Sequence, residues 1–333
     1  MTVTTTEPAS RRKPAGGSSS FVARHFGVLS ISVVFLVLFV VFSVQADAFL
    51  TANNLVNVLR QVAPTVIVAM AMTFVITTGQ IDLSVGSIVG LSAAALGLWA
   101  ESGNAIVALA LTMVMGLGIG LLSGALTAYG RLQSFIVTLA ALTAVRGVAL
   151  LLTEGFSTPI DSPWIVPLGQ GKLLGLYTPT WIALAVVVLA WYVFSQTRFG
   201  RYVVAVGSNA ESLRRSGVDI RRIRMIVLGM TGFAAALAGV ITAARLSSGS
   251  PNSGTMFELE VITAVVLGGT SLMGGRGSVI GSAIGALTLG IISNGLVLLR
   301  VDVYWVPIVQ GIILVVAILL NSKLFGRFSR ASV

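Results

Sequence analysis

Cysteine is absent from the 333-residue sequence, and histidine occurs once, as His25. Without cysteine there can be no disulfide, no thiolate metal site and no cysteine nucleophile. A single histidine cannot build a histidine metal site, and it leaves little basis for histidine general-base catalysis. We therefore expect no catalytic residues, no metal and no cofactor in this chain.

Charged residues are also scarce. Asp, Glu, Lys and Arg together make up 10% of the sequence, whereas hydrophobic residues make up 56% and the mean hydropathy is +0.97. Soluble domains carry about 25% charged residues, so this chain has too few to cover the surface of a soluble fold. The composition predicts an integral membrane protein and excludes a stand-alone soluble enzyme.

Nucleotide-binding motifs are missing as well. Neither G-x-x-x-x-G-K-[ST] nor G-x-G-x-x-G occurs, and residues 169–172 lack both the leading glycine and the following Ser or Thr. These motifs supply the backbone N–H groups that bind phosphates. The glycine-rich residues 268–277 lie between apolar spans without a phosphate-clamping lysine, so they predict a tight turn between closely packed helices. The chain therefore shows no nucleotide site of its own.

Ten apolar segments follow one another along the chain. A membrane-spanning helix needs about 20 mostly apolar residues, and most of these segments reach or approach that length. The sequence therefore predicts an all-α integral membrane protein, a polytopic bundle of about ten transmembrane helices. The first segment is longer than the apolar region of an ordinary signal peptide, so we expect it to be a retained span. The predicted spans are residues 27–46, 55–78, 84–100, 105–129, 135–153, 179–195, 224–247, 256–273, 279–299 and 303–321.

Lys and Arg are distributed unevenly between the predicted loops. With the N-terminus inside, the internal segments carry Arg131, Arg198, Arg201, Arg214, Arg215, Arg221, Arg222, Arg276, Lys323, Arg327 and Arg330. External segments are mostly acidic, and Lys172 and Arg300 are their basic residues. This satisfies the positive-inside rule and places both termini in the cytoplasm. It also accounts for the net charge of +10 without a nucleic-acid partner. The predicted division is a disordered cytoplasmic tail at 1–25, a transmembrane domain at 26–322 and a cytoplasmic tail at 323–333.

Two predicted loops are much longer than the others: the external loop at 154–178 and the internal loop at 196–223. Loops of this length in a compact domain are usually functional. In the internal loop, Asn209 can cap a helix, and Ser216 with Gly217 can end it. This predicts a short amphipathic helix on the cytoplasmic surface. It would be either a docking helix for a soluble partner or an ordinary basic connection lying on anionic lipid.

Glycine recurs every four positions in several predicted spans. The repeats are Gly86 and Gly90; Gly116, Gly120 and Gly124; and Gly277, Gly281 and Gly285. This spacing places the glycines on one helix face and lets two backbones approach closely in lipid. We therefore expect these residues to pack helices together in a tight bundle.

A few charged residues fall within or beside the predicted spans. Asp82 lies between the second and third spans, Arg146 lies about two-thirds of the way across the fifth, and Glu258 and Glu260 open the eighth. A charge at membrane depth costs at least about 2.5 kcal/mol and therefore needs a reason. Asp82 could cap the following helix, and Arg146 could extend toward the external surface. Alternatively, the two could form the relay of an ion-coupled carrier, although such a carrier would need several carboxylates facing one cavity.

Several short motifs occur in order between residues 50 and 320. They are G-Q-I-D-L-S-V-G at 79–86; S-F-I-V-T-L at 134–139 with R-G at 146–147; T-R-F-G-R at 197–201 with A-V-G-S-N-A at 205–210 and S-G-V at 216–218; G-G-T-S-L at 268–272 with G-G-R-G at 274–277; and N-G-L at 294–296. Together they resemble the ribose-type ABC-transporter permeases, the membrane subunits of bacterial monosaccharide importers. Gln80 and Ser208 stand where that family usually has glycine.

The resemblance implies a fold and a set of partners. The implied fold has ten spans with both termini inside, which agrees with the charge distribution. The implied partners are one or more cytoplasmic ABC ATPase subunits, a second permease subunit expected to be an identical copy, and an extracytoplasmic substrate-binding protein that docks partly on loop 154–178. The implied location is the lipid bilayer of the bacterial plasma membrane, which the chain crosses many times.

We therefore interpret the chain as the permease subunit of an ATP-driven importer for a monosaccharide or similar small polar solute. ATP hydrolysis would take place in the separate ATPase, so the chain itself is not expected to be an enzyme. The predicted coupling residues are Gly207, Asn209, Ala210, Ser216 and Gly217. The predicted pathway or gate residues are Asp82, Ser84, Phe135, Thr138 and Asn294. The alternative is an ion-coupled secondary transporter that uses Asp82 and Arg146.

Overall fold

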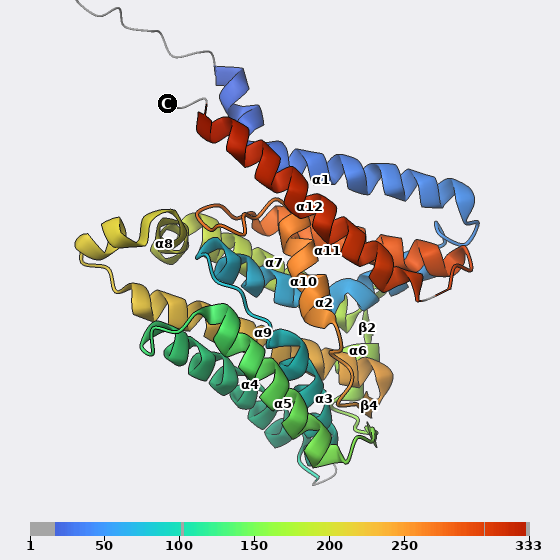
Figure 1. Cartoon of the computed structure of the whole chain (residues 1–333). Helices are drawn as coiled ribbons and strands as arrows, with labels where there is room; N and C mark the ends of the chain where they lie inside the picture. Colours follow the sequence, from blue (N-terminus) through green and yellow to red (C-terminus); the bar gives the residue numbers. More distant parts are fainter. Residues whose placement is uncertain (1–16, 101–102, 303, 331–333) are drawn as a thin grey trace, which may run out of the picture.

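The computed structural model describes residues 17–100, 103–302 and 304–330. Within these residues the chain is almost entirely helical (Figure 1), which confirms the predicted all-α fold. The helices are α1 (Gly17–Gln45), α2 (Ala52–Thr77), α3 (Val85–Ala100), α4 (Ala105–Ala128), α5 (Ser134–Thr153), α6 (Val166–Gln170), α7 (Thr178–Gln196), α8 (Arg198–Arg215), α9 (Ile220–Leu246), α10 (Phe257–Leu267), α11 (Val279–Leu298) and α12 (Trp305–Arg330). The strands are β1 (Thr158–Pro159), β2 (Lys172–Leu173), β3 (Leu176–Tyr177) and β4 (Ser248–Gly249).

Seven helices in the described part of the chain are long and apolar enough to cross a membrane. These spans are Val28–Gln45, Ala52–Thr77, Ala105–Ala128, Ser134–Thr153, Thr178–Gln196, Ile220–Leu246 and Val279–Leu298. Helix α3 and the apolar part of α12, Trp305–Ala317, are shorter. The predicted span 256–273 is only partly helical, because α10 ends at Leu267 and glycine-rich turns follow it. Gly269 there adopts a φ of +89°, a left-handed conformation that stops a helix.

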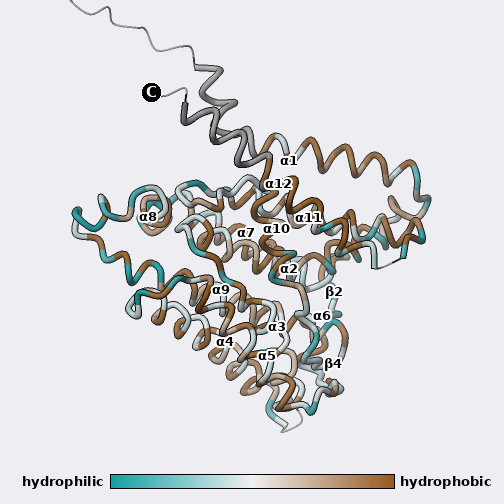
Figure 2. Tube along the Cα trace, in the orientation of Figure 1, coloured by the Kyte–Doolittle hydropathy of each residue, from teal (hydrophilic) through white to brown (hydrophobic). Residues whose placement is uncertain are grey.

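Helices α2 and α9 form the centre of the bundle. From Val62 onward the residues of α2 are buried, and most residues of α9 after Val227 are buried as well. The outer helices α1, α4, α5 and α7 instead expose many apolar side chains. In Figure 2 hydrophobic segments cover these outer helices, while hydrophilic segments gather mainly around α8 and, at the opposite end, around β2 and β4. An apolar belt between two polar ends is the surface expected of a protein embedded in lipid.

The predicted glycine repeats do bring backbones together. A Cβ added at Gly120 of α4 would collide with the Leu228 carbonyl of α9, and one at Gly281 of α11 would collide with the Gly268 carbonyl after α10. The pair in α3 differs from this pattern. Gly86 and Gly90 pack against the backbone of a non-helical segment at residues 251–254, and Gly86 also meets the Glu258 side chain of α10.

The long loop after α5 folds back onto the bundle. Its strand β1 pairs with β4, and the Ile160 N–H donates to the Ser247 carbonyl at 3.0 Å. Helix α6 is bonded to α2, because the Arg60 Nε of α2 donates to the Gly169 carbonyl at 2.8 Å. Trp164 and Leu174 remain largely exposed on this loop.

The predicted tails lie at the edges of the described residues. Residues 1–16 of the predicted disordered tail lie outside them, and α1 begins at Gly17, within the predicted tail. At the other end α12 extends to Arg330, and residues 331–333 lie outside the described part. The domain boundaries at 25 and 323 therefore stay predictions.

Candidate functional site

Helix α8 lies at one polar end of the bundle and begins earlier than the sequence predicted. The helix starts at Arg198, where the Thr197 hydroxyl caps it by accepting from the Gly200 N–H at 3.3 Å. Its first half is docked on the bundle because Val203 and Val206 are buried. Phe199 adds a stacked contact to Phe74 of α2, with ring centroids 6.2 Å apart. The first half of α8 is thus part of the bundle's packing.

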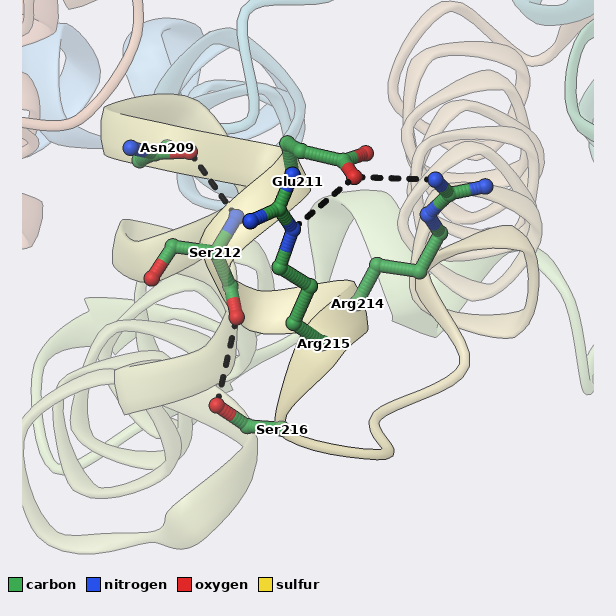
Figure 3. Close-up of polar contacts among 6 residues, drawn as sticks. All are labelled: Asn209, Glu211, Ser212, Arg214, Arg215 and Ser216. Atoms are coloured by element: carbon green, nitrogen blue, oxygen red, sulfur yellow. Dashed lines mark hydrogen bonds and ion pairs between the residues drawn. The ribbon is translucent and has the colours of Figure 1, made fainter.

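Asn209 divides α8 into two segments. Its φ of −158° breaks the helix, and its side-chain oxygen accepts from the Ser212 N–H at 2.9 Å (Figure 3). The second segment ends at Arg215, and Gly217 follows with a φ of +83°. Glycine is favoured there because a side-chain Cβ would make this left-handed backbone conformation unfavourable. The predicted cap at Asn209 and the predicted stop at Ser216 and Gly217 are therefore confirmed.

The second segment of α8 presents charge to the solvent. Glu211 forms ion pairs with Arg214 at 2.9 Å and with Arg215 at 3.3 Å, and all three side chains are exposed (Figure 3). The hydrogen bond from Arg214, followed by that from Arg215, lowers the pKa of Glu211 below its ordinary value. Exposed pairs of this kind contribute little stability. They do leave a polar, net positive helix on the surface.

Gly207 occupies a different environment from the other predicted coupling residues. A Cβ at Gly207 would collide with the Thr77 carbonyl at the end of α2 and with the backbone of Gly275. The Gly275 N–H also donates to that Thr77 carbonyl at 2.9 Å. Asn209, Ser216 and Gly217 are exposed, and Ala210 is partly buried. The structure thus places Gly207 at a joint between α8, α2 and the turns after α10, whereas the others belong to the surface segment.

Asp82 lies fully buried before α3. Its Oδ1 accepts from the Ser84 N–H at 2.9 Å and from the Ser84 hydroxyl at 2.6 Å. Its Oδ2 accepts from the Thr231 hydroxyl of α9. Asp82 therefore fixes the backbone of Ser84 just before α3 and ties this segment to α9. Ser84 is also fully buried.

The other predicted pathway residues do not share one location. Thr138 of α5 is buried and donates to the Ser134 carbonyl at 2.9 Å. Phe135 beside it is 49% exposed. Asn294 of α11 exchanges two hydrogen bonds with Asn54 of α2, at 2.9 and 3.0 Å. The structure gathers Asp82, Ser84 and Thr138 around residues 81–84 and leaves Asn294 apart, so their role in the pathway stays a prediction.

Arg146 has neighbours that the sequence did not indicate. Its guanidinium donates to the Thr255 hydroxyl at 2.9 Å and to the Gly254 carbonyl at 3.1 Å. Glu258 lies three residues after Thr255, in the first turn of α10, and carries the charge opposite to that of Arg146. Among the described residues no ion pair joins Arg146 to Asp82.

A bundle of apolar helices with a polar surface helix at one end is an arrangement expected of a membrane transport subunit. Residues 54–318 match the family described as "Branched-chain amino acid transport system / permease component". The chain therefore belongs to this family of permeases. It is a multi-pass protein of the bacterial plasma membrane and a transport subunit, not an enzyme.

Several curated relatives are similar over nearly the whole chain. The ribose import permease protein RbsC of Escherichia coli (strain K12) is 42% identical over 298 residues, which cover 87% of this chain and 92% of that protein. The L-arabinose ABC transporter permease protein AraH of Azospirillum brasilense is 36% identical, covering 87% of this chain and 86% of that protein. The xylose transport system permease protein XylH of Escherichia coli (strain K12) is 32% identical, covering 92% of this chain and 95% of that protein. No solved structure matches the chain significantly.

Proposed function

We propose that this permease carries a monosaccharide across the membrane as part of an ATP-driven importer, and that pentoses are the first solutes to test. The observation that carries the proposal is the similarity over 87–92% of the chain to permeases named for ribose, L-arabinose and xylose. The ion-coupled alternative has less support, because both carboxylate oxygens of Asp82 are bonded to neighbouring side chains.

The proposed binding site for a cytoplasmic ATPase is the second segment of α8. Its exposed charged residues and its fixed ends at Asn209 and Gly217 suit a helix that fits a groove on a soluble partner. The first segment is packed on α2 through Phe199, and its Val203 is buried in the bundle. A movement of the partner would therefore be transmitted to the bundle through Gly207 and the backbone of Thr77.

The remaining partners are an external binding protein and a second permease. The loop at 154–178 is the proposed dock for the binding protein, because it is anchored to α9 while Trp164 and Leu174 stay exposed. The second permease is proposed to be another copy of this chain. Mass measurement of the complex purified from native membranes tests both, and a mass that fits one permease copy would contradict the second.

The function is tested by uptake of radiolabelled ribose, L-arabinose and xylose in native cells that lack the chain and in the same cells with it restored. We expect uptake of at least one pentose to require the chain, to stop when arsenate depletes ATP and to persist when a protonophore collapses the proton gradient. Uptake that follows the proton gradient and survives ATP depletion would contradict the proposal.

A further inference from the structure

The short helices α3 and α10 begin next to each other inside the bundle. At about 1.5 Å per residue, the 16 residues of α3 span about 24 Å and the 11 residues of α10 about 17 Å. Both are shorter than the roughly 30 Å hydrocarbon core. Each is preceded by non-helical chain, residues 78–84 before α3 and residues 247–256 before α10. Figure 1 shows the first of these segments as a non-helical stretch of chain between the end of α2 and the start of α3.

The non-helical segment before α10 runs along α3 toward its start. Gly249 lies against Gly97 near the end of α3, the Pro251 carbonyl lies against Gly90, and the Gly254 carbonyl lies against Gly86. Glu258 in the first turn of α10 also lies against Gly86. The N-terminal ends of α3 and α10 therefore meet inside the bundle. Discontinuous helices that point their N-terminal ends into a membrane protein commonly form its substrate site.

Arg146 reaches this junction from α5. It lies about 18 Å along a helix that is about 30 Å long, and therefore well away from both ends of the helix. Its two side-chain hydrogen bonds go to Thr255 and Gly254, at 2.9 and 3.1 Å, and a guanidinium has five N–H donors. Arg146 is only partly buried, and Thr255 is exposed. An arginine that faces lipid at this depth would be costly. We therefore expect the face that carries Arg146 and Thr255 to contact water and not lipid.

Glu258 supplies an acceptor that the protein itself leaves unused. Its side chain is 9% exposed, and its Oε2 has no hydrogen-bond partner among the described residues. A buried polar atom without a partner is costly, so such an atom calls for a ligand. Glu258 and Arg146 carry opposite charges, and both lie at this junction. Together they favour a neutral ligand with several hydroxyl groups over an ion of either sign.

We propose that Arg146, Thr255 and Glu258 form a solute-contacting site inside the translocation pathway, where they hydrogen-bond the hydroxyl groups of a sugar in transit. The site rests on the proposed function as a sugar importer. In this proposal the solute contacts the junction of α3 and α10. Asp82 and Ser84 are instead fully buried and bonded to each other at the start of α3.

Water access is tested by cysteine labelling, because the sequence contains no cysteine that would react in the background. Thr255→Cys is compared with Leu189→Cys, whose parent residue is 62% exposed on the apolar surface of α7. In the complete importer, we expect a hydrophilic methanethiosulfonate reagent to label position 255 and not position 189. We also expect excess pentose, added with the binding protein and ATP, to slow labelling at 255. Equal, slow labelling at both positions would overturn the site.

Solute contact is tested by Arg146→Lys and Glu258→Gln in the assembled importer with saturating binding protein. Since a hydrogen bond to a charged group is worth roughly tenfold or more, we expect the maximal uptake rate to fall by about that factor. The effect should be smaller for deoxy analogues that lack the bonded hydroxyl. The matched controls are Arg222→Lys and Asp302→Asn, whose exposed parent residues pair with Asp219 at 3.0 Å and accept from the Tyr304 N–H at 3.0 Å, away from the junction.

The outcomes separate the site from the proposed function. If the unaltered importer takes up no sugar, the function fails. If it takes up pentose normally while both variants behave like their controls, the site fails and the function stands. If the variants lower the amount of assembled complex but leave the rate per complex and the preference among deoxy analogues unchanged, the face holds copies of the chain together and the site is likewise refuted.

Discussion

Replacing Asp82 should show that it is a buried support for α3. The carboxylate accepts from the Ser84 N–H, the Ser84 hydroxyl and the Thr231 hydroxyl. Losing the acceptor of the Ser84 N–H costs about 1 kcal/mol, the net value of a typical hydrogen bond. A buried hydroxyl left without its acceptor costs about 1–3 kcal/mol, and Thr231 falls at the low end because it also reaches the Leu228 carbonyl at 2.9 Å. We expect Asp82→Ala to lower the free energy of unfolding by about 2–4 kcal/mol.

Asp82→Asn should cost less than Asp82→Ala. The amide oxygen can still accept from Ser84, and the amide nitrogen can donate to the Thr231 hydroxyl, which keeps its bond to Leu228. The assay is reversible unfolding of the purified permease in mixed micelles with increasing dodecyl sulfate. Uptake by the asparagine variant should remain independent of the proton gradient, in contrast to what an ion-coupled carrier would show.

A double-mutant cycle gives the decisive comparison. Thr231→Val should destabilise the unaltered protein by more than it destabilises the Asp82→Ala variant, because in the latter the shared hydrogen bond is already gone. Residues in direct contact typically show coupling of about 0.5–3 kcal/mol. Strict additivity of the two changes, or an Asp82→Ala protein as stable as the original, would refute the reasoning.

Three further predictions concern glycine packing and α8. Gly120→Leu should destabilise the α4–α9 packing and lower the unfolding temperature in detergent, whereas Gly118→Leu should not, because a Cβ at Gly118 meets open space. Gly207→Val should separate α8 from the Thr77 carbonyl at a cost of about 1–3 kcal/mol, and pull-down with the ATPase should show binding while uptake is lost. Gly217→Val should strain the end of α8 by about 1–2 kcal/mol and weaken ATPase retention in the same pull-down, with Val218→Ala as the control. Unchanged uptake in the Gly207 variant, or unchanged retention in the Gly217 variant, would contradict the corresponding role.

The long apolar helices were predictable because their pattern is local. The predicted spans 105–129 and 135–153 differ from α4 and α5 by one residue at one end. The cap at Asn209 was also predictable, because the cap and the helix it starts are adjacent in sequence. Features that depend on an apolar run or on neighbouring residues thus follow from the sequence directly.

The first half of α8 and the junction at Arg146 were not predictable in this way. Residues 198–208 form a helix that buries Val203 and Val206 in the bundle and stacks Phe199 on Phe74 of α2, which no local pattern reveals. Arg146 and Thr255 are separated by 109 positions in the sequence. Their contact exists only because residues 247–256 turn back along the glycine face of α3. The glycines of α3 were a usable signal for close approach, but they do not say that the approaching chain is non-helical.

Non-helical chain inside a membrane protein is stable only where its backbone groups are bonded within the protein. Residues 78–84 meet this condition. The Ile81 N–H donates to Ser134 at 3.2 Å, the Ile81 carbonyl accepts from Thr138 at 3.3 Å, and Asp82 bonds the backbone of Ser84. The same short stretch begins beside Gly207 of α8 and ends where α3 starts. The surface helix and the junction of the two half-helices are therefore connected by only a few residues of chain, in which Ile81 is bonded to α5 and Asp82 to α9. A displacement of α8 must either break those hydrogen bonds or move α5 and α9 with it.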